Sequence, residues 1–236
     1  MGRVWLRLVL GALTYMLLDA DFQLINEEFY ADVVTPEQQD LLLEDGWRHF
    51  GPHFFRYNLG IYDNEIRLVL PLRIQLKDFK LSKSQRRVLR RNADAEVEIG
   101  PVTLEEETLD LFERHKRRFK KGEPETIYDF LARDGEPVDV LELQVRREGR
   151  LLAASFFDVG AISVSSIYGI FDPDETTGSL GIFTMLKEIE YASTTGRSLY
   201  YHGYAYEGSS FYDYKKRFSA LEMFDWNGGW LPFDNR

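Results

Sequence analysis

The sequence predicts a mixed α/β (α+β) fold in which helices flank a mixed sheet. Three observations favour this class. Residues 138–171 contain three consecutive strand-like runs separated by short turns. Residues 180–192 carry apolar side chains at about 3.6-residue spacing, which is typical of a helix. Residues 199–206 form another strand-like run, so the strands at 162–171 and 199–206 are expected to be parallel neighbours joined by a crossover.

The composition limits the kind of chemistry. The chain has 236 residues, 44% of them hydrophobic, which is enough for one large core or two small ones. It has no cysteine, which excludes disulfides, thiolate metal sites and a cysteine nucleophile. The histidines lack paired-ligand spacing, so no metal site is expected. The net charge of −10 argues against diffuse binding to nucleic acid such as DNA, but it permits a local basic surface.

The N-terminal region is apolar without being a membrane span. Arg3 and Arg7 interrupt it, and the uninterrupted part, residues 8–18, is too short to cross a bilayer. No signal-peptide cleavage site follows it. We therefore expect a cytoplasmic protein with no membrane partner, and we expect the first fifteen residues to be dispensable.

The next elements are a helix and a hairpin. Thr35 and Gln38 form a predicted capping box with Pro36 at the first helical position, and Gly46 ends the helix. Residues 54–76 then predict an antiparallel hairpin about the turn at residues 62–65.

A basic helix follows. Ser82 and Gln85 form a second predicted capping box, and the next turns carry an unbroken set of cations on one face. A solvated charged face normally mixes both signs, so this face predicts a phosphate backbone as partner. The candidate binding residues are Lys83, Ser84, Arg86, Arg87, Arg90 and Arg91. The dipole of its own helix favours a second basic cluster at residues 114–121, and an extension of the same basic surface is the alternative.

The loop before the crossover helix is the second candidate site. Gly178, Ser179 and Gly181 surround the predicted helix N-terminus, where free N–H groups favour an anion. A tight turn without a ligand explains these residues equally well. The helix is followed by the strand at 199–206, a predicted helix at 209–218 and a last strand at 221–233 with a turn at 226–229.

This order of elements is that of the GNAT acyltransferase core, in which the parallel strands splay and the acyl donor lies between them. Several short motifs also resemble those of the aminoacyl-tRNA–protein transferases, the arginyl-tRNA–protein transferase family with its bacterial leucyl relatives. They are SKSQRRVLRRN from Ser82, WRHFG from Trp47, SSIYGIFDPD from Ser165, SLG from Ser179, LKEIE from Leu186, YYHGY from Tyr200 and YKKRF from Tyr214. The resemblance covers roughly residues 29–233. The cysteine cluster common in this family is missing from residues 54–73, which puts the acceptor preference in doubt.

The resemblance implies a GNAT-like fold and transfer of an amino acid from charged tRNA to the N-terminal α-amine of a protein, usually one beginning with an acidic residue. The aminoacyl ester is already activated, so no nucleophile and no cofactor are required. In this interpretation the basic helix binds acceptor-stem phosphates and residues 178–181 hold the terminal phosphate or ribose. Lys215 binds the acidic acceptor side chain. The candidate catalytic residues, which would stack the terminal adenine or donate a proton, are Tyr168, Tyr201 and Tyr204. Core packing explains each tyrosine equally well.

We divide the chain into an N-terminal extension (residues 1–25), a transferase region with the basic helix (26–121) and a GNAT-like region (122–236). The transferred amino acid is left open, since arginine calls for an acidic pocket, for which Asp172 and Glu207 are available, and leucine for an apolar one. Two other functions are considered. An N-acetyltransferase using acetyl-CoA would need a basic or Gln residue leading the loop at 177–181, which is absent. A non-catalytic tRNA-binding protein would need only the basic helix.

Overall fold

The computed structural model describes residues 23–119 and 122–233. The expectation about the first fifteen residues lies outside these ranges. The strands are β1 (Asn26–Tyr30), β2 (Arg48–Phe50), β3 (His53–Tyr57), β4 (Leu59–Tyr62), β5 (Glu65–Gln75), β6 (Glu96–Pro101), β7 (Val140–Arg147), β8 (Arg150–Val159), β9 (Ser163–Phe171), β10 (Leu199–Tyr206), β11 (Leu221–Phe224) and β12 (Trp230–Pro232). The α-helices are α2 (Pro36–Glu44), α3 (Lys83–Arg91), α4 (Glu106–Lys116) and α5 (Leu180–Thr194), and the 3₁₀ helices are η1 (Leu76–Asp78), η2 (Ile127–Asp129) and η3 (Phe211–Arg217).

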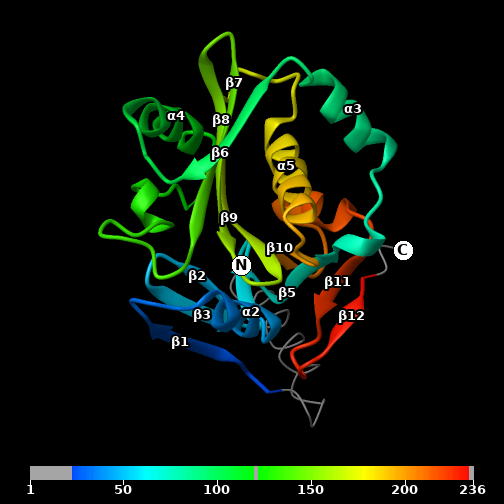
Figure 1. Ribbon diagram of the computed structural model, residues 1–236. Coiled ribbons are helices and arrows are strands. Elements are labelled where there is room, and N and C mark those ends of the chain that lie inside the picture. The colour runs from blue at the N-terminus through cyan, green and yellow to red at the C-terminus, as the bar shows by residue number, and fades with distance from the viewer. Residues whose placement is uncertain (1–22, 120–121, 234–236) are drawn as a thin grey trace, which may run out of the picture.

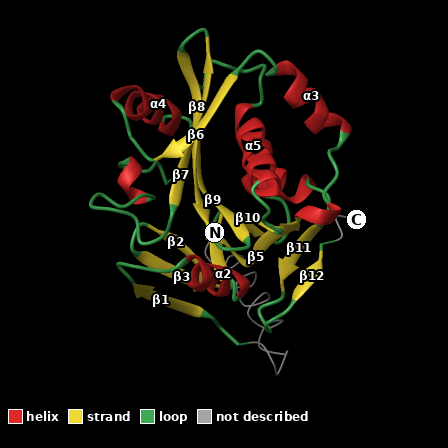
Figure 2. Ribbon diagram, in the orientation of Figure 1, coloured by secondary structure: helices red, strands yellow, loops and turns green. Residues whose placement is uncertain are grey.

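A large mixed sheet forms the centre of the molecule (Figure 2). Its strand order is β12-β11-β5-β10-β9-β8-β7-β6, and β4 pairs with β5 off this path. Strands β1, β3 and β2 form a separate three-stranded sheet. Segments from both sides of residue 121 share the large sheet, because β5 lies between β11 and β10 and β6 pairs with β7.

Strands β9 and β10 are parallel over only three residue pairs. The last of these pairs joins Ser165 to Tyr201. Beyond it β9 continues beside β8, while β10 continues beside β5. The predicted crossover and the splayed parallel pair of a GNAT-like fold are therefore confirmed. The separation coincides with a register shift in β10 at Gly203, whose φ of 84° lies in the left-handed region that favours glycine.

Helices cover both faces of the sheet (Figure 1). Helix α5 buries Phe183, Leu186 and Ile189 in the larger core cluster. Helix α4 and η2 cover the other face, where Leu111 and Phe112 pack with Ile127. Full burial of one such side chain contributes about 1.5–3 kcal/mol, so these two layers hold the sheet between them. No helix of the described residues is long and apolar enough to cross a membrane.

Local signals gave most of the boundaries correctly. The capping boxes at Thr35 and Ser82 are both present, and the turn between β4 and β5 falls at residues 63–64. One prediction was wrong in detail, since the predicted helix at 209–218 is the 3₁₀ helix η3. The predicted strand at 221–233 with its turn at 226–229 is present as the hairpin of β11 and β12.

Candidate active site

The candidate site lies where β9 and β10 separate. We call this region the junction and define it by Ser166 of β9, Gly203 of β10 and the charged side chains beside them, Arg48, Glu188 and Lys215. Past the pair Ser165–Tyr201 the two strands no longer bond to each other. Buried backbone groups need other partners there.

Arg48 supplies one of these partners. It comes from β2, directly after Trp47, and its residue is only 8% exposed. Its Nη1 donates to Ser165 Oγ at 2.5 Å, and its Nη2 donates to the backbone oxygen of Ser166. The guanidinium therefore satisfies the first β9 carbonyl beyond the last strand pair.

Lys215 provides a hydrogen-bond partner for a backbone carbonyl of β10. It lies in η3, and its Nζ donates to the backbone oxygen of Tyr204 at 3.1 Å. Burial, followed by the nearby charge of Arg48, lowers the pKa of Lys215 to about 7, against the opposing effect of Glu188. Gly203 leaves room for both cations: a Cβ there would stand 3.4 Å from Lys215 Nζ and 3.5 Å from Arg48 Nη2.

The two cations have no carboxylate bonded to them within the described ranges. The bonds of Arg48 and Lys215 run to a hydroxyl and to backbone carbonyls. The nearby buried Asp158 is engaged elsewhere, by His49 at 3.0 Å and by Gln39 at 3.0 Å. Burial lowers the pKa of Arg48, and Asp158 opposes that shift at longer range. Because an unpaired buried cation is costly, the junction favours an incoming anion.

Glu188 is the acidic member of the junction. It projects from α5 with no exposed surface, and Tyr200 Oη donates to its Oε2 at 2.7 Å. Burial raises the pKa of Glu188 to about 7, although Tyr200, Ser155, Ser166 and Arg48 all act to lower it. The junction thus combines two cations with a carboxylate that titrates near neutrality.

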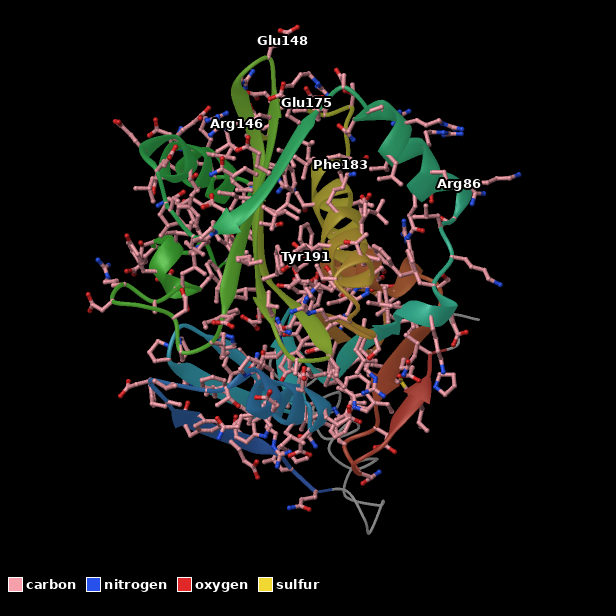
Figure 3. All side chains as sticks on the ribbon, viewed as in Figure 1. Arg86, Arg146, Glu148, Glu175, Phe183 and Tyr191 are labelled. Atoms are coloured by element: carbon pink, nitrogen blue, oxygen red, sulfur yellow. The ribbon has the colours of Figure 1, made fainter. Side chains whose placement is uncertain are left out.

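The basic face of α3 is present and exposed. Arg86, Arg87 and Arg90 lie on the solvent side, while Val88 is buried against the core. Arg86 projects away from the helix in Figure 3. The end of α3 is tied to the loop before α5, because Asn92 donates to the backbone oxygen of Gly178 at 2.8 Å. Helix α3 therefore lies beside the start of the crossover helix, with its cations on the side that faces solvent.

Several known proteins are similar to this chain in sequence. The profile of the family described as "Arginine-tRNA-protein transferase, C terminus" matches residues 107–225. An aspartate/glutamate leucyltransferase of Stenotrophomonas maltophilia is 31% identical over 205 residues, which cover 83% of this chain and 80% of that protein. The chain belongs to the arginine-tRNA-protein transferase family. It is an aminoacyltransferase.

Two further comparisons accompany these. An aspartate/glutamate leucyltransferase of Xanthomonas campestris pv. campestris is 34% identical over 175 residues, which cover 69% of this transferase and 69% of that one. Among solved structures, FemX is 13% identical, with a TM-score of 0.48, and the match covers 89% of this chain and 72% of that chain.

The transferase does not bring the three predicted catalytic tyrosines together. Tyr168 stacks on Phe130 with ring centroids 3.7 Å apart, in the cluster on the α4 face. The hydroxyl of Tyr201 lies 3.3 Å from Arg73 Nη1. The hydroxyl of Tyr204 donates to the backbone oxygen of Gly46 at 2.7 Å. Of the three, Tyr204 lies nearest in sequence to the junction, and its backbone oxygen holds Lys215.

The loop predicted to bind an anion leads directly into α5. Ser179 is the N-cap of α5 in a left-handed conformation, with φ 51°, and its side chain makes no capping hydrogen bond. Gly178 packs closely on Asn92, since a Cβ there would stand 2.8 Å from the Asn92 side-chain oxygen. Lys83, Ser84 and Arg91 complete the predicted RNA surface, all three exposed, and Arg91 also donates to the backbone oxygen of Thr177 at 3.2 Å.

The sequence reasoning missed two junction residues. Arg48 was part of the quoted WRHFG motif, but nothing local indicated that its side chain is buried. Glu188 did carry a signal: at helical spacing it falls on the buried face of α5, between Met185 and Ala192. A carboxylate on an apolar helix face is a candidate for a shifted pKa.

Proposed function

We propose that this transferase moves leucine from leucyl-tRNA to the N-terminal α-amine of proteins that begin with aspartate or glutamate. The observation that carries the proposal is the pair of cations at the junction, Arg48 and Lys215, neither of which is bonded to a carboxylate within the described part of the chain. The names of the curated relatives support both the donor and the acceptor.

The acceptor carboxylate would bind between the two cations. Charge-assisted hydrogen bonds to a carboxylate are about twice as strong as neutral ones, and a guanidinium can make two at once. Binding would also relieve the electrostatic cost of holding two like charges close together in a buried place. An acceptor beginning with an uncharged residue would leave that cost in place, which explains a preference for aspartate or glutamate.

Leucine is favoured over arginine as the transferred residue. Of the two carboxylates that could have formed an acidic pocket, Asp172 is fully buried and already paired with Arg114 at 2.8 Å and with Arg150. Glu207 is exposed. Neither is therefore placed to enclose a guanidinium.

The tRNA would lie along α3, with acceptor-stem phosphates on its basic face. The loop of Gly178, Ser179 and Gly181 would hold the terminal phosphate or ribose. Tyr204 would frame the junction near the reacting ester. Since charged tRNA is a cytoplasmic substrate, the reaction is placed in the cytoplasm.

Transfer itself needs little chemistry from the protein. The ester is activated, so an amine held in line with its carbonyl reacts without a covalent intermediate on the enzyme. The curated relatives do not favour acetyl transfer from acetyl-CoA or a silent RNA-binding role.

The test is a transfer assay with the purified protein. We would incubate it with radiolabelled Leu-tRNA or Arg-tRNA and peptides that differ only in a first residue of Asp, Glu or Ala. Label from Leu-tRNA on the Asp and Glu peptides alone supports the proposal. Label from Arg-tRNA would reassign the donor. A mass gain of one acetyl group with acetyl-CoA, and no label from either tRNA, would overturn it.

A further inference from the structure

We infer that Glu188 is the general base of this reaction, taking the proton from the α-ammonium of the acceptor at the junction. The inference rests on the proposed function, because it concerns how that acceptor is made nucleophilic. An ammonium has no lone pair and cannot attack an ester until a proton leaves it.

The geometry leaves one oxygen of Glu188 free for this task. The carboxylate is fully buried, and its Oε2 accepts the hydrogen bond of Tyr200. Its Oε1 is also buried and makes no hydrogen bond of normal geometry within residues 23–119 and 122–233, although the hydroxyls of Ser155 and Ser166 lie close enough to lower the pKa of the carboxyl. A buried acceptor atom without a donor is costly, so an incoming ammonium N–H would find a ready partner there.

The groups that act on Glu188 come from β2, β8, β9, β10 and η3. On β8 and β9 they are the neutral hydroxyls of Ser155 and Ser166, and on β10 it is Tyr200, whose pKa burial raises well above its ordinary value. The remaining neighbours are Arg48 on β2 and, on η3, Lys215 and Tyr214. Glu188 is the one member of this set that can ionise to a negative charge near neutral pH.

The acceptor itself strengthens the base. With the junction empty, Arg48 and Lys215 stabilise the ionised carboxylate of Glu188. When the carboxylate of an N-terminal Asp or Glu binds these cations, it cancels part of their charge and adds a like charge beside Glu188. Both effects raise the pKa of Glu188 toward that of a free α-ammonium, near 8. An acidic first residue would thus promote deprotonation of its own amine.

The proton balance is complete without a co-reactant. Glu188 takes one proton from the α-ammonium, and the nitrogen lone pair forms the C–N bond with the ester carbonyl carbon. The C–O bond to the ribose breaks, and the ribose oxygen keeps that electron pair. This oxygen takes the second proton of the amine. Glu188 then releases its proton to solvent, so one proton is liberated for each amide bond formed.

The test compares Glu188→Gln with Glu190→Gln, an exposed carboxylate on the same helix. We would measure kcat/KM for an Asp-initiated peptide at saturating charged tRNA from pH 5.5 to 9. Glu188→Gln is expected to lower kcat/KM about 100-fold or more at pH 7. Its pH profile should lack the rise in kcat/KM near pH 7 that ionisation of Glu188 causes in the wild type. The residual rate should follow ionisation of the peptide amine. Glu190→Gln should behave as wild type. A Glu188→Gln enzyme with the wild-type rate and profile overturns the inference.

Two further measurements separate chemistry from structure. A hydrazino-terminated peptide, whose terminal nitrogen is already neutral at pH 7, should restore most of the rate to Glu188→Gln, whereas failure of rescue in a folded variant contradicts a proton-accepting role. Tyr200→Phe keeps the carboxylate of Glu188 but removes a hydrogen bond that lowers its pKa. The acidic limb of the kcat/KM profile should therefore move to higher pH. An acidic limb at the wild-type pH would contradict the role of Glu188 as general base. If the wild-type protein transfers no amino acid at all, the proposed function has failed, a result distinct from active but pH-unchanged variants.

Discussion

The hydroxyl of Tyr200 donates a hydrogen bond to Glu188 at 2.7 Å, and neither side chain has any exposed surface. This hydrogen bond joins strand β10 to helix α5 one residue before the last parallel pair of β9 and β10. A carboxylate held in this way influences stability as well as catalysis, because its protonation differs between the folded and unfolded chain.

The first prediction concerns stability against pH. Burial raises the pKa of Glu188 from its ordinary value of 4.5 to about 7, so the folded state binds more protons in that window. The stability contributed by the protonated form is complete below pH 4.5 and is lost as the pH rises to about 7. Urea unfolding at a series of pH values should show that Glu188→Gln lacks this decline, which Glu190→Gln retains. Equal slopes of unfolding free energy against pH in the two variants would contradict this prediction.

Lys215 produces the opposite slope. Burial lowers its pKa from 10.5 to about 7, so the unfolded state binds more protons between these values and stability rises with pH there. Below about pH 7 the amine of Lys215 is charged in both states, so the full cost of burying this charge lowers the free energy of unfolding there. The second prediction is that Lys215→Met removes the rise above pH 7 in the same urea titration. Lys187→Met, a substitution on the outer side of α5, should leave it in place.

Lys215 also tests acceptor recognition. Loss of one charge-assisted hydrogen bond costs about 1.5–3 kcal/mol, so kcat/KM of Lys215→Met for an Asp-initiated peptide should fall roughly 10- to 100-fold. An Ala-initiated peptide, which has no side-chain carboxylate for Lys215 to bind, should stay at its low background rate. The measurement is the ratio of the two rates in parallel transfer assays, with Lys187→Met as the control. A uniform loss on both peptides would assign Lys215 a purely structural role.

Local structure was predictable because its causes are local. The capping pairs at Thr35 and Ser82, the apolar spacing of α5 and the short turns of the meander each depend on residues a few positions apart. The crossover rule then gave parallel β9 and β10 without any long-range information. The exposed basic face of α3 followed from the same helical spacing.

The junction was not predictable, since it depends on distant pairings. Strand β5 enters the sheet between β11 and β10, a placement that no local pattern specifies. Arg48 and Lys215 belong to elements far apart in the chain, and only the fold brings them together beside Gly203.

The RNA surface gives a third class of prediction. Reversing Arg86 and Arg87 to Glu removes two exposed cations and adds two anions on α3 without touching the core, so folding should be unchanged. Binding of charged tRNA should fall to background. For single replacements by Gln, the slope of log affinity against log salt should decrease by about 0.7–0.9 for each phosphate that is no longer neutralised. Arg133→Gln, an exposed arginine outside α3, is the control. Tight, salt-insensitive binding by the double variant would remove α3 from the interface.

Gly203 provides the last prediction, because a matched glycine separates backbone strain from loss of space. Gly203 and Gly149 both have positive φ, 84° and 78°, so alanine at either site should cost about 1–2 kcal/mol in unfolding free energy. A Cβ at Gly149 meets nothing within 4 Å, whereas one at Gly203 would make van der Waals contact with both Lys215 Nζ, at 3.4 Å, and Arg48 Nη2, at 3.5 Å. The added methyl group would occupy space beside the two cations where the acceptor carboxylate is proposed to bind. Gly203→Ala should therefore also lower kcat/KM for Asp-initiated peptides about 10-fold or more, while Gly149→Ala keeps full activity at a temperature where both are folded. Equal activities would mean that the space beside the two cations is not needed for transfer.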